Sequence, residues 1–206
     1  MQEIITNNRE NENSMEEKRA RSSAEDLGWI VDYHSGQTEV FGAIYDKYVR
    51  KIYDFIYFKT HHKETAEDLC SRVFMKCLEH IANYDAQKGS FSSWLYRIAT
   101  NTVIDHYRTQ KSNVDIVDAW DIASSEDVAR DVENRDQFSQ VQKYLADLKP
   151  EQREIIILRI WNDLSYKEIA EIIGKSEDNC KMIFSRAVGT MRKEVLLAFL
   201  IMFFGR

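Results

Sequence analysis

Residues 164–191 constrain the fold most, because they hold two helical periods separated by a single glycine. Ser165 is a good N-cap, and Glu168 three residues later completes a capping box. Gly174 can adopt the left-handed backbone conformation that ends a helix, and Ser176 can cap a second one. Two short helices that meet at a glycine corner form the helix-turn-helix pattern, which is typical of DNA binding. A plain helical hairpin is the alternative interpretation.

The second of these helices has one apolar face and one polar face. Its apolar residues, beginning with Cys180 and Phe184, recur at three- and four-residue spacing. The opposite face carries Asp178, Asn179, Lys181, Met182, Ser185 and Arg186. These six are the candidate DNA-contacting residues of this helix.

The composition predicts an all-α protein. The 206 residues include one proline and seven glycines, whereas helix-forming residues are plentiful and alternating strand patterns closed by Asn-Gly turns are missing. The length allows one or two domains. We expect two helical domains joined by a flexible linker.

The net charge of −6 is unusual for a nucleic-acid-binding protein, so its distribution matters. Residues 1–34 and 112–136 together hold ten more acids than bases, which leaves the remainder at about +4. The acidic segments are those that we expect to be least ordered. The folded parts are therefore mildly basic, which is compatible with DNA binding.

Periodicity divides the chain into five parts. Residues 1–34 are polar and aperiodic, and we expect them to be mostly disordered. Residues 35–111 contain three amphipathic helical stretches, the second with Leu78 on its inner side, and form the first predicted domain. The acidic segment 112–125 is the predicted linker, and 126–194 form a second domain with Pro150 in the first turn of a helix. Residues 195–206 are an apolar tail that packs back on the protein or meets a partner.

The last helical stretch of the first domain combines cations with aromatic residues. Arg97 and Arg108 lie on its predicted outer face, and Trp94, Tyr96 and Tyr107 are interleaved with them. Aromatic rings beside cations can stack bases and hold a nucleic-acid backbone. A solvated basic face over core aromatics explains the same pattern.

Metal-dependent and enzymatic functions have little support in the sequence. Cys70 and Cys77 are seven residues apart on one helical face, as two buried apolar residues would be, and close metal-ligand spacing is missing around His61 and His62. Gly-rich phosphate loops and nucleophile elbows are also missing. We expect no metal, no cofactor, no small-molecule substrate and no enzymatic activity. A cytoplasmic location is expected from three features of the sequence. The three cysteines, of which Cys180 is the third, are an odd number, and we find neither a signal peptide nor an apolar run of about 20 residues.

Two long segments resemble a known family. AEDLCSRVFMKCL (66–78) with FSSWLYRIATNTVIDHYR (91–108) resembles region 2 of the extracytoplasmic-function (ECF) sigma factors of bacterial RNA polymerase. LKPEQREIIILRIWNDLSYKEIAEIIGKS (148–176) resembles their region 4. The order of the two segments and the linker between them also match.

The resemblance implies a subunit that binds core RNA polymerase, recognises two promoter elements and helps to melt one of them. It implies core-polymerase binding by Asp68, Leu69, Arg72 and Phe74. It implies minus-10 contacts by Trp94, Arg97, Asn101, Asp105 and Arg108. The six polar-face residues of the helix-turn-helix would then meet the minus-35 element in the major groove. Members of the family are often held inactive by an anti-sigma factor, for which the tail or residues 29–31 could form an interface.

The sequence departs from the family pattern in the second helix of the helix-turn-helix. Asp178 and Asn179 stand where small or hydroxyl residues are usual, Met182 replaces a typical serine, and Ile183 stands where arginine is common. Fewer cations imply weaker phosphate binding or a different minus-35 sequence. Two alternatives remain open, namely a free-standing helix-turn-helix regulator and an enzyme acting on nucleic acid.

Overall fold

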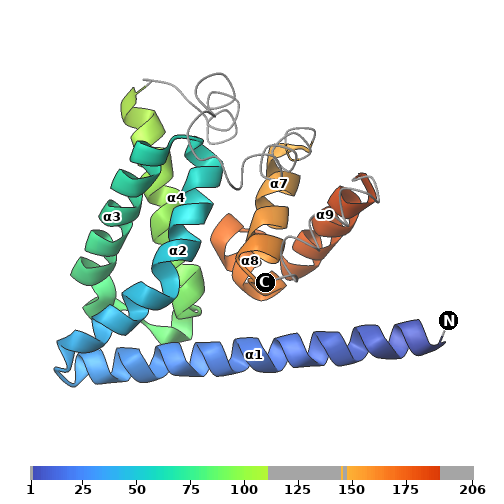
Figure 1. Cartoon of the computed structure of the whole chain (residues 1–206), viewed down its shortest axis with the longest axis horizontal. Coiled ribbons are helices and arrows are strands. Elements are labelled where there is room, and N and C mark those ends of the chain that lie inside the picture. The colour runs from blue at the N-terminus through green and yellow to red at the C-terminus, as the bar shows by residue number, and fades with distance from the viewer. Residues whose placement is uncertain (1, 111–144, 146–147, 191–206) are drawn as a thin grey trace.

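The computed structural model describes residues 2–110, 145 and 148–190, and all regular elements in those ranges are helical (Figure 1). The predicted all-α class is thereby confirmed. The elements are α1 (Gln2–His34), η1 (Thr38–Val40), α2 (Phe41–Thr60), α3 (Lys63–His80), η2 (Ile81–Asn83), η3 (Ala86–Lys88), α4 (Phe91–Gln110), α7 (Pro150–Ile156), the π-helical turn η4 (Ile157–Trp161), α8 (Tyr166–Ile173) and α9 (Glu177–Thr190).

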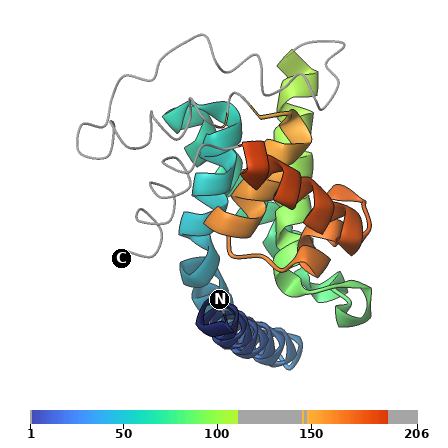
Figure 2. The same ribbon diagram turned by 90° about the vertical axis from the view of Figure 1, so that its right-hand side faces the viewer.

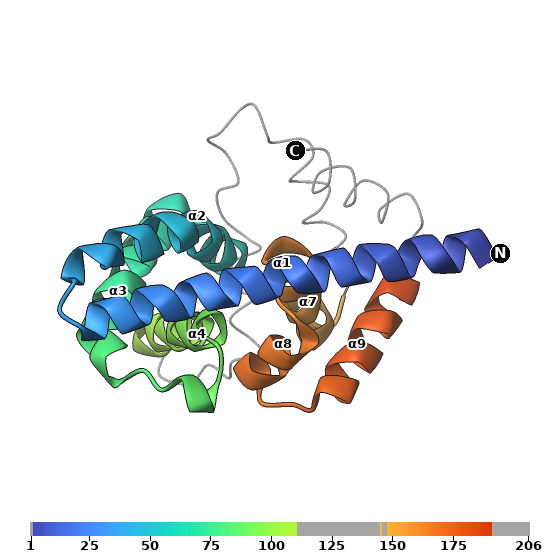
Figure 3. The same ribbon diagram turned by 90° about the horizontal axis from the view of Figure 1, so that it is seen from below.

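The helices form two groups that lie side by side. Helices α1–α4 make an amino-terminal bundle, and α7, η4, α8 and α9 make a carboxy-terminal bundle (Figure 1). Helix α1 runs along one side of the amino-terminal bundle and continues past the carboxy-terminal one (Figure 3). The two helical regions predicted from the sequence are confirmed. The predicted linker 112–125, the start of the second domain from 126 and the tail 195–206 lie outside the described residues.

The amino-terminal bundle is built on the apolar stripes that periodicity predicts. Ile44, Ile52 and Phe55 of α2 are fully buried against α3 and α4, which contribute residues such as Val73 and Leu95. Burial of each such side chain is worth about 1.5–3 kcal/mol, so the apolar stripes fix how these helices pack. The face of α3 and α4 left outside the core is consequently available to partners.

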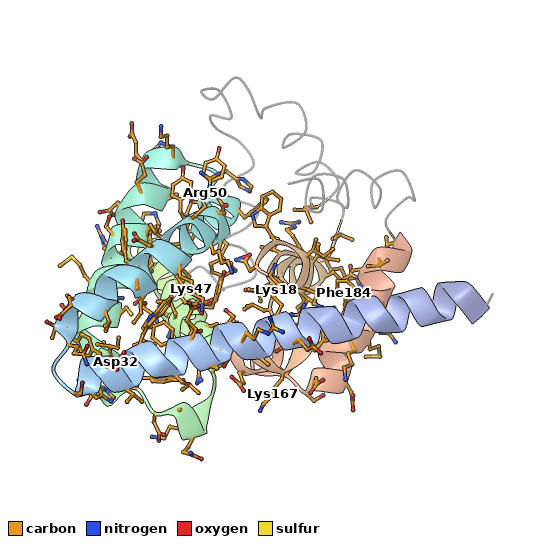
Figure 4. All side chains as sticks on the ribbon, turned by 60° about the horizontal axis from the view of Figure 1, so that its bottom comes forward. Lys18, Asp32, Lys47, Arg50, Lys167 and Phe184 are labelled. Atoms are coloured by element: carbon orange, nitrogen blue, oxygen red, sulfur yellow. The ribbon has the colours of Figure 1, made fainter. Side chains whose placement is uncertain are left out.

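Helix α1 overturns one sequence prediction. Residues 1–34 were expected to be mostly disordered, but the structure places a helix over Gln2–His34, so that prediction was wrong. The carboxylate of Asp26 accepts hydrogen bonds from Lys47 Nζ and Tyr48 Oη, both at 2.7 Å, and Ile30 is buried. Lys47 lies where α1 meets α2 (Figure 4). Tertiary contacts therefore stabilise the carboxy-terminal half of this helix.

The carboxy-terminal bundle begins with a proline-initiated helix, as predicted. Pro150 opens α7, where its missing N–H costs little. The buried guanidinium of Arg153 donates to the carbonyls of Leu145 (2.7 Å) and Leu148 (3.2 Å). Isoleucines of α7 and Ile169 of α8 fill the space between the helices. These contacts fix the start of the bundle.

The two bundles meet along a seam of mixed polar and apolar contacts. Helix α8 packs on α4, and the carboxy-terminal bundle covers part of the amino-terminal one when seen from its side (Figure 2). Lys59 Nζ lies 2.7 Å from Glu154 Oε1, and the ring of Phe58 meets the ring of Trp161 at a centroid distance of 4.3 Å. From α1, the guanidinium of Arg19 lies 2.6 Å from the Asp163 carboxylate.

We predict that Tyr48→Phe lowers the free energy of unfolding by about 1–3 kcal/mol, because it removes a donor from the buried carboxylate of Asp26. Urea denaturation followed by circular dichroism would measure the change. Tyr45→Phe is the matched control, since the Tyr45 side chain is 42% exposed and its substitution should change stability by less than about 0.5 kcal/mol. Equal effects of the two substitutions would contradict the docking of α1 through Asp26.

His61, which ends α2 with a left-handed φ of 51°, should make stability depend on pH. Burial and the positive charge of Arg153 lower the pKa of His61 from 6.5 to about 4. The unfolded chain therefore binds a proton near pH 6.5 that the folded chain does not bind. The free energy of unfolding is therefore highest above pH 6.5, and protonation of the unfolded chain lowers it by about 2–3 kcal/mol as the pH falls towards 4.

The test is the unfolding free energy of His61→Asn between pH 7 and pH 4. Asparagine tolerates the left-handed backbone and does not titrate, so this variant should lose most of the pH dependence. His80→Asn, at an exposed position near the end of α3, should retain it. A parallel pH profile for His61→Asn and the wild type would refute the assignment.

Candidate nucleic-acid interfaces

Helices α8 and α9 form the corner that the sequence predicts. Ser165 Oγ accepts from the N–H of Glu168 at 3.2 Å, and Glu168 Oε2 accepts from the N–H of Ser165 at 2.8 Å, which completes the capping box. Gly174 ends α8 with a φ of 70°. Ser176 Oγ then accepts from the N–H of Asn179 at 3.3 Å. The helix-turn-helix geometry is therefore present, with backbone caps at the positions assigned from the sequence.

Helix α9 turns one face to its own bundle and the other to solvent. Cys180 and Ala187 are buried, while Ile183 and Phe184 pack against the core. Five of the six candidate DNA-contacting residues are exposed, and Asn179 is half-buried. The exposed five are Asp178, Lys181, Met182, Ser185 and Arg186.

The charge on the outer face of α9 is nearly balanced. Lys181 Nζ lies 2.8 Å from Glu177 Oε1 and 3.9 Å from Asp178 Oδ1. Its hydrogen bond to Glu177 raises the pKa of Lys181. Arg186 adds a further exposed cation to the same helix. A face with so little net charge gains little from counterion release and binds DNA weakly by itself.

Helix α4 presents a second polar stripe. Arg97, Asn101, Asp105 and Arg108 are exposed and recur at three- and four-residue spacing, so they share one side of the helix. Lys76 of α3 joins this side, with its Nζ 3.8 Å from Asp105 Oδ2. The structure thus brings together four of the five predicted minus-10 residues.

The aromatic residues of α4 divide between surface and core. Trp94 is half-buried, and its ring lies 5.5 Å from those of Tyr84 and Phe91. Tyr96 and Tyr107 are buried, and the hydroxyl of Tyr107 donates to the carbonyl of Lys59 at 3.0 Å. Trp94 is therefore the aromatic residue of α4 that remains open to base stacking in this arrangement.

The four predicted polymerase-binding residues of α3 fall in two environments. Asp68 and Arg72 are exposed and form an i,i+4 ion pair at 2.9 Å. Leu69 and Phe74 are buried, so they support the helix and do not offer their side chains to a partner. The exposed apolar side chains of α3 are instead Met75 (63%) and Leu78 (47%). Periodicity had assigned Leu78 to the core and gave no signal for Met75.

A serine cluster before and within the first turn of α4 was missed in the sequence. The hydroxyls of Ser90 and Ser92 both donate to Glu168 Oε1 on α8, and the hydroxyl of Ser93 donates to Glu171 Oε2. Ser90 also caps α4, since its Oγ accepts from the N–H of Ser93 at 3.2 Å. In a sequence, serines at this position are explained by helix capping. The neighbouring residues give no indication that carboxylates from the other bundle bind these serines.

Comparisons with known proteins match segments of both bundles to one family. The family model described as Sigma-70 region 2 matches residues 44–113, and that described as Sigma-70, region 4 matches residues 138–191. The ECF RNA polymerase sigma factor SigM of Bacillus subtilis is 32% identical over 145 residues, which cover 70% of this chain and 88% of SigM. The chain belongs to the ECF sigma factors of the sigma-70 family.

A second relative has the same identity but a greater length. The ECF RNA polymerase sigma factor BldN of Streptomyces coelicolor is 32% identical over 175 residues, which cover 83% of this chain and 66% of BldN. Among solved structures, the sigma factor RpoE of Bartonella quintana, in complex with the anti-sigma factor NepR, has a TM-score of 0.60 at 24% identity. That match covers 76% of this chain and 96% of RpoE, and it shows a shared fold.

The family identifies the chain as a transcription initiation factor. It is an RNA polymerase sigma factor that directs promoter-specific initiation, and the alternative of a free-standing regulator is not favoured. In the part of the chain that the structure describes, no helix combines the length and the apolar character needed to cross a membrane. Within the same ranges, no three His, Cys, Asp or Glu side chains are grouped as metal ligands would be.

We predict that Glu177→Gln strengthens promoter binding of the holoenzyme, because it frees Lys181 from its nearest acid. One additional phosphate contact should steepen the dependence of log affinity on log salt by about 0.9. Binding to a labelled promoter duplex over a salt series would measure this slope. Glu17→Gln is the matched control, since Glu17 pairs with Arg21 at 3.8 Å on α1, outside the proposed promoter surfaces. A slope unchanged by Glu177→Gln would mean that Lys181 does not approach a phosphate.

Proposed function

We propose that this sigma factor reads the minus-35 element with the outer face of α9. The observation that carries the proposal is the exposure of Asp178, Lys181, Met182, Ser185 and Arg186 on one side of a helix that follows a capped glycine corner. Such a helix fits the major groove, with polar side chains near base edges and Arg186 near a phosphate. Asn179, which is half-buried, completes the set at the inner edge of this face.

The second promoter contact in this proposal is the polar side of α4. Arg97 and Arg108 would hold the backbone of the minus-10 strand, while Asn101 and Asp105 would approach its bases. Trp94 and the rings around it would offer a stacking surface for a base taken out of the duplex. Unstacking a base costs a few kcal/mol, which stacking at about 1–3 kcal/mol per base can offset.

Core polymerase would bind the exposed side of α3. Asp68 and Arg72 supply charge at the rim, and the neighbouring exposed Met75 and Leu78 supply the apolar anchor that an interface needs at its centre. Leu69 and Phe74 hold this surface from beneath. Because polymerase would supply much of the affinity for the promoter, α9 could select a DNA sequence without binding DNA tightly by itself.

The proposal further includes a cytoplasmic protein without enzymatic activity, held inactive by an anti-sigma factor. A solved structure contains the sigma factor RpoE in complex with the anti-sigma factor NepR, and another, with a TM-score of 0.59 at 19% identity, contains CnrH in complex with the cytosolic domain of CnrY. Of residues 29–31, Val31 is 66% exposed, whereas Ile30 is buried and Trp29 lies under the Lys47 amine at 5.1 Å. Of these three residues, Val31 is the one available to such a partner in this arrangement.

Run-off transcription with purified core polymerase tests the function, using a promoter found by mapping transcript starts in the native cell. We expect transcript only when this chain is added. Arg186→Ala should weaken holoenzyme binding across promoter sequences and reduce the salt slope by about 1. Arg50→Ala, which removes an exposed arginine on α2, should change neither quantity. Equal amounts of run-off transcript with and without the chain would contradict the proposal.

A further inference from the structure

We propose that Asp105 of α4 selects a base with an exocyclic amino group at one position of the minus-10 element, and that Lys76 of α3 is the positioning residue that orients the Asp105 carboxylate. This inference rests on the proposed function of α4, in which Asp105 approaches the bases. It adds the class of base that the carboxylate accepts and the neighbouring helix that holds the carboxylate in place.

The amine of Lys76 is anchored on α4 by a buried hydroxyl. Its Nζ donates to Oγ1 of Thr102 at 3.3 Å, and Thr102 is only 3% exposed. The same Nζ lies 3.8 Å from Oδ2 of Asp105, one turn further along α4. Helices α3 and α4 pack directly on each other, which fixes the start of the lysine side chain (Figure 1). The positive charge therefore faces Asp105 from one direction before any DNA arrives.

The carboxylate of Asp105 keeps accepting capacity for a ligand. Its side chain is 61% exposed, and Oδ2 is the oxygen that faces Lys76. Among the residues that the structure describes, no hydrogen bond reaches the other oxygen, Oδ1. An ionised carboxylate has about four lone-pair sites and no proton to donate. Asp105 can therefore accept a hydrogen bond from a base but cannot donate one.

A group that only accepts hydrogen bonds divides the four bases into two classes. Cytosine and adenine carry an exocyclic amino group, whereas thymine and guanine carry a carbonyl oxygen at the corresponding place on the major-groove edge. The amino group donates to a carboxylate. The carbonyl oxygen would face a negative charge and lose its hydrogen bond to water. Asp105 should therefore favour cytosine or adenine over thymine or guanine at the position that it meets.

The base at Asp105 differs from the base that stacks at Trp94. Both residues lie on the polar side of α4, and they are separated by roughly 16 Å along the helix axis at about 1.5 Å per residue. Successive bases of one strand of a duplex are about 3.4 Å apart, so this span covers several of them. Selection by Asp105 is therefore a contact additional to the stacking surface.

Lys76 also limits the electrostatic cost of placing a carboxylate beside DNA. By itself, the negative charge of Asp105 would repel the phosphates of the bound strand. With Lys76, Arg97 and Arg108 around it, the polar side of α4 keeps an excess of positive charge. An exposed ion pair contributes roughly 0–1 kcal/mol to folding. Removing Lys76 should consequently alter base selection much more than it alters stability.

The test is competition binding by the holoenzyme, assembled from core polymerase and the full-length chain. A labelled duplex carries a promoter found by mapping transcript starts, and each unlabelled competitor carries one substituted minus-10 base pair. At one position, the wild type should prefer the base with an amino group by about tenfold. Each ratio compares two duplexes with the same protein, so it does not depend on the fraction of protein that is folded.

Asp105→Asn should abolish this preference at that position and leave the other positions within about twofold. The amide that replaces the carboxylate can both donate and accept, so it accommodates either class of base. This pattern separates base selection from general damage, because a structural defect would weaken binding to all duplexes equally.

Lys76→Met should reduce the preference at the same position by about threefold or more, because the carboxylate loses its orienting charge. Lys76→Arg keeps a positive charge and hydrogen-bond donors, so it should retain most of the preference. Lys63→Met is the matched control, since it removes an exposed lysine from the first turn of the same helix. Its base preferences should equal those of the wild type.

An unchanged map of base preference in Asp105→Asn would refute base selection by this residue. An unchanged map in Lys76→Met, or an equal loss of affinity for every duplex, would refute the positioning role and leave Lys76 at most a phosphate contact. A wild-type map without any preference for amino-bearing bases would overturn the whole inference. A wild-type holoenzyme that binds none of the promoters would count against the proposed function instead.

Discussion

The carboxylate of Glu168 connects the local order of the helix-turn-helix to the arrangement of the whole chain. One oxygen caps α8 through Ser165, and the other accepts hydroxyls from the start of α4 in the other bundle. A cap of this kind is worth about 1 kcal/mol to its helix, so the carboxylate is oriented whether or not the bundles touch. The contact across the seam therefore costs little additional side-chain entropy. A local folding signal thus also determines which face of α8 meets α4.

The two proposed promoter surfaces differ in how they can gain affinity. The outer face of α9 pairs its lysine with neighbouring acids, so it offers hydrogen-bonding groups and little net charge. The polar side of α4 has arginines at both ends and a half-buried tryptophan beside its start. Electrostatic attraction supplies most of non-specific DNA binding, whereas contacts with base edges supply selectivity. In the proposed function, the weakly charged outer face of α9 would discriminate between sequences while the polymerase holds the complex together.

Sequence reasoning succeeded where one helix determines the outcome and failed where two distant segments do. The capping box at Ser165, the corner at Gly174 and the exposed face of α9 follow from local spacing, and all are present. The helix over residues 2–34 was missed because its anchor, Asp26, acts through Lys47 and Tyr48, more than twenty positions away. The serine cluster was missed for the same reason, since its carboxylate partner lies 76 and 78 positions along the chain. Leu78 was assigned to the core because periodicity identifies a stripe but not how far the neighbouring helices cover it.

The seam between the bundles is held by ion pairs and hydrogen bonds together with the Phe58–Trp161 ring contact. Two domains joined in one chain meet at an effective concentration in the millimolar range. A contact between them with a dissociation constant near 1 mM, which corresponds to about 4 kcal/mol, therefore holds the bundles together in about half of the molecules. Net contributions of about 1 kcal/mol per hydrogen bond from a few serine, asparagine and arginine contacts reach that value. A partner that binds only the open form contributes about 4 kcal/mol at a thousand times its dissociation constant. The ion pairs and hydrogen bonds of the seam can be rehydrated when the bundles separate, so such a partner can shift the balance towards the open form.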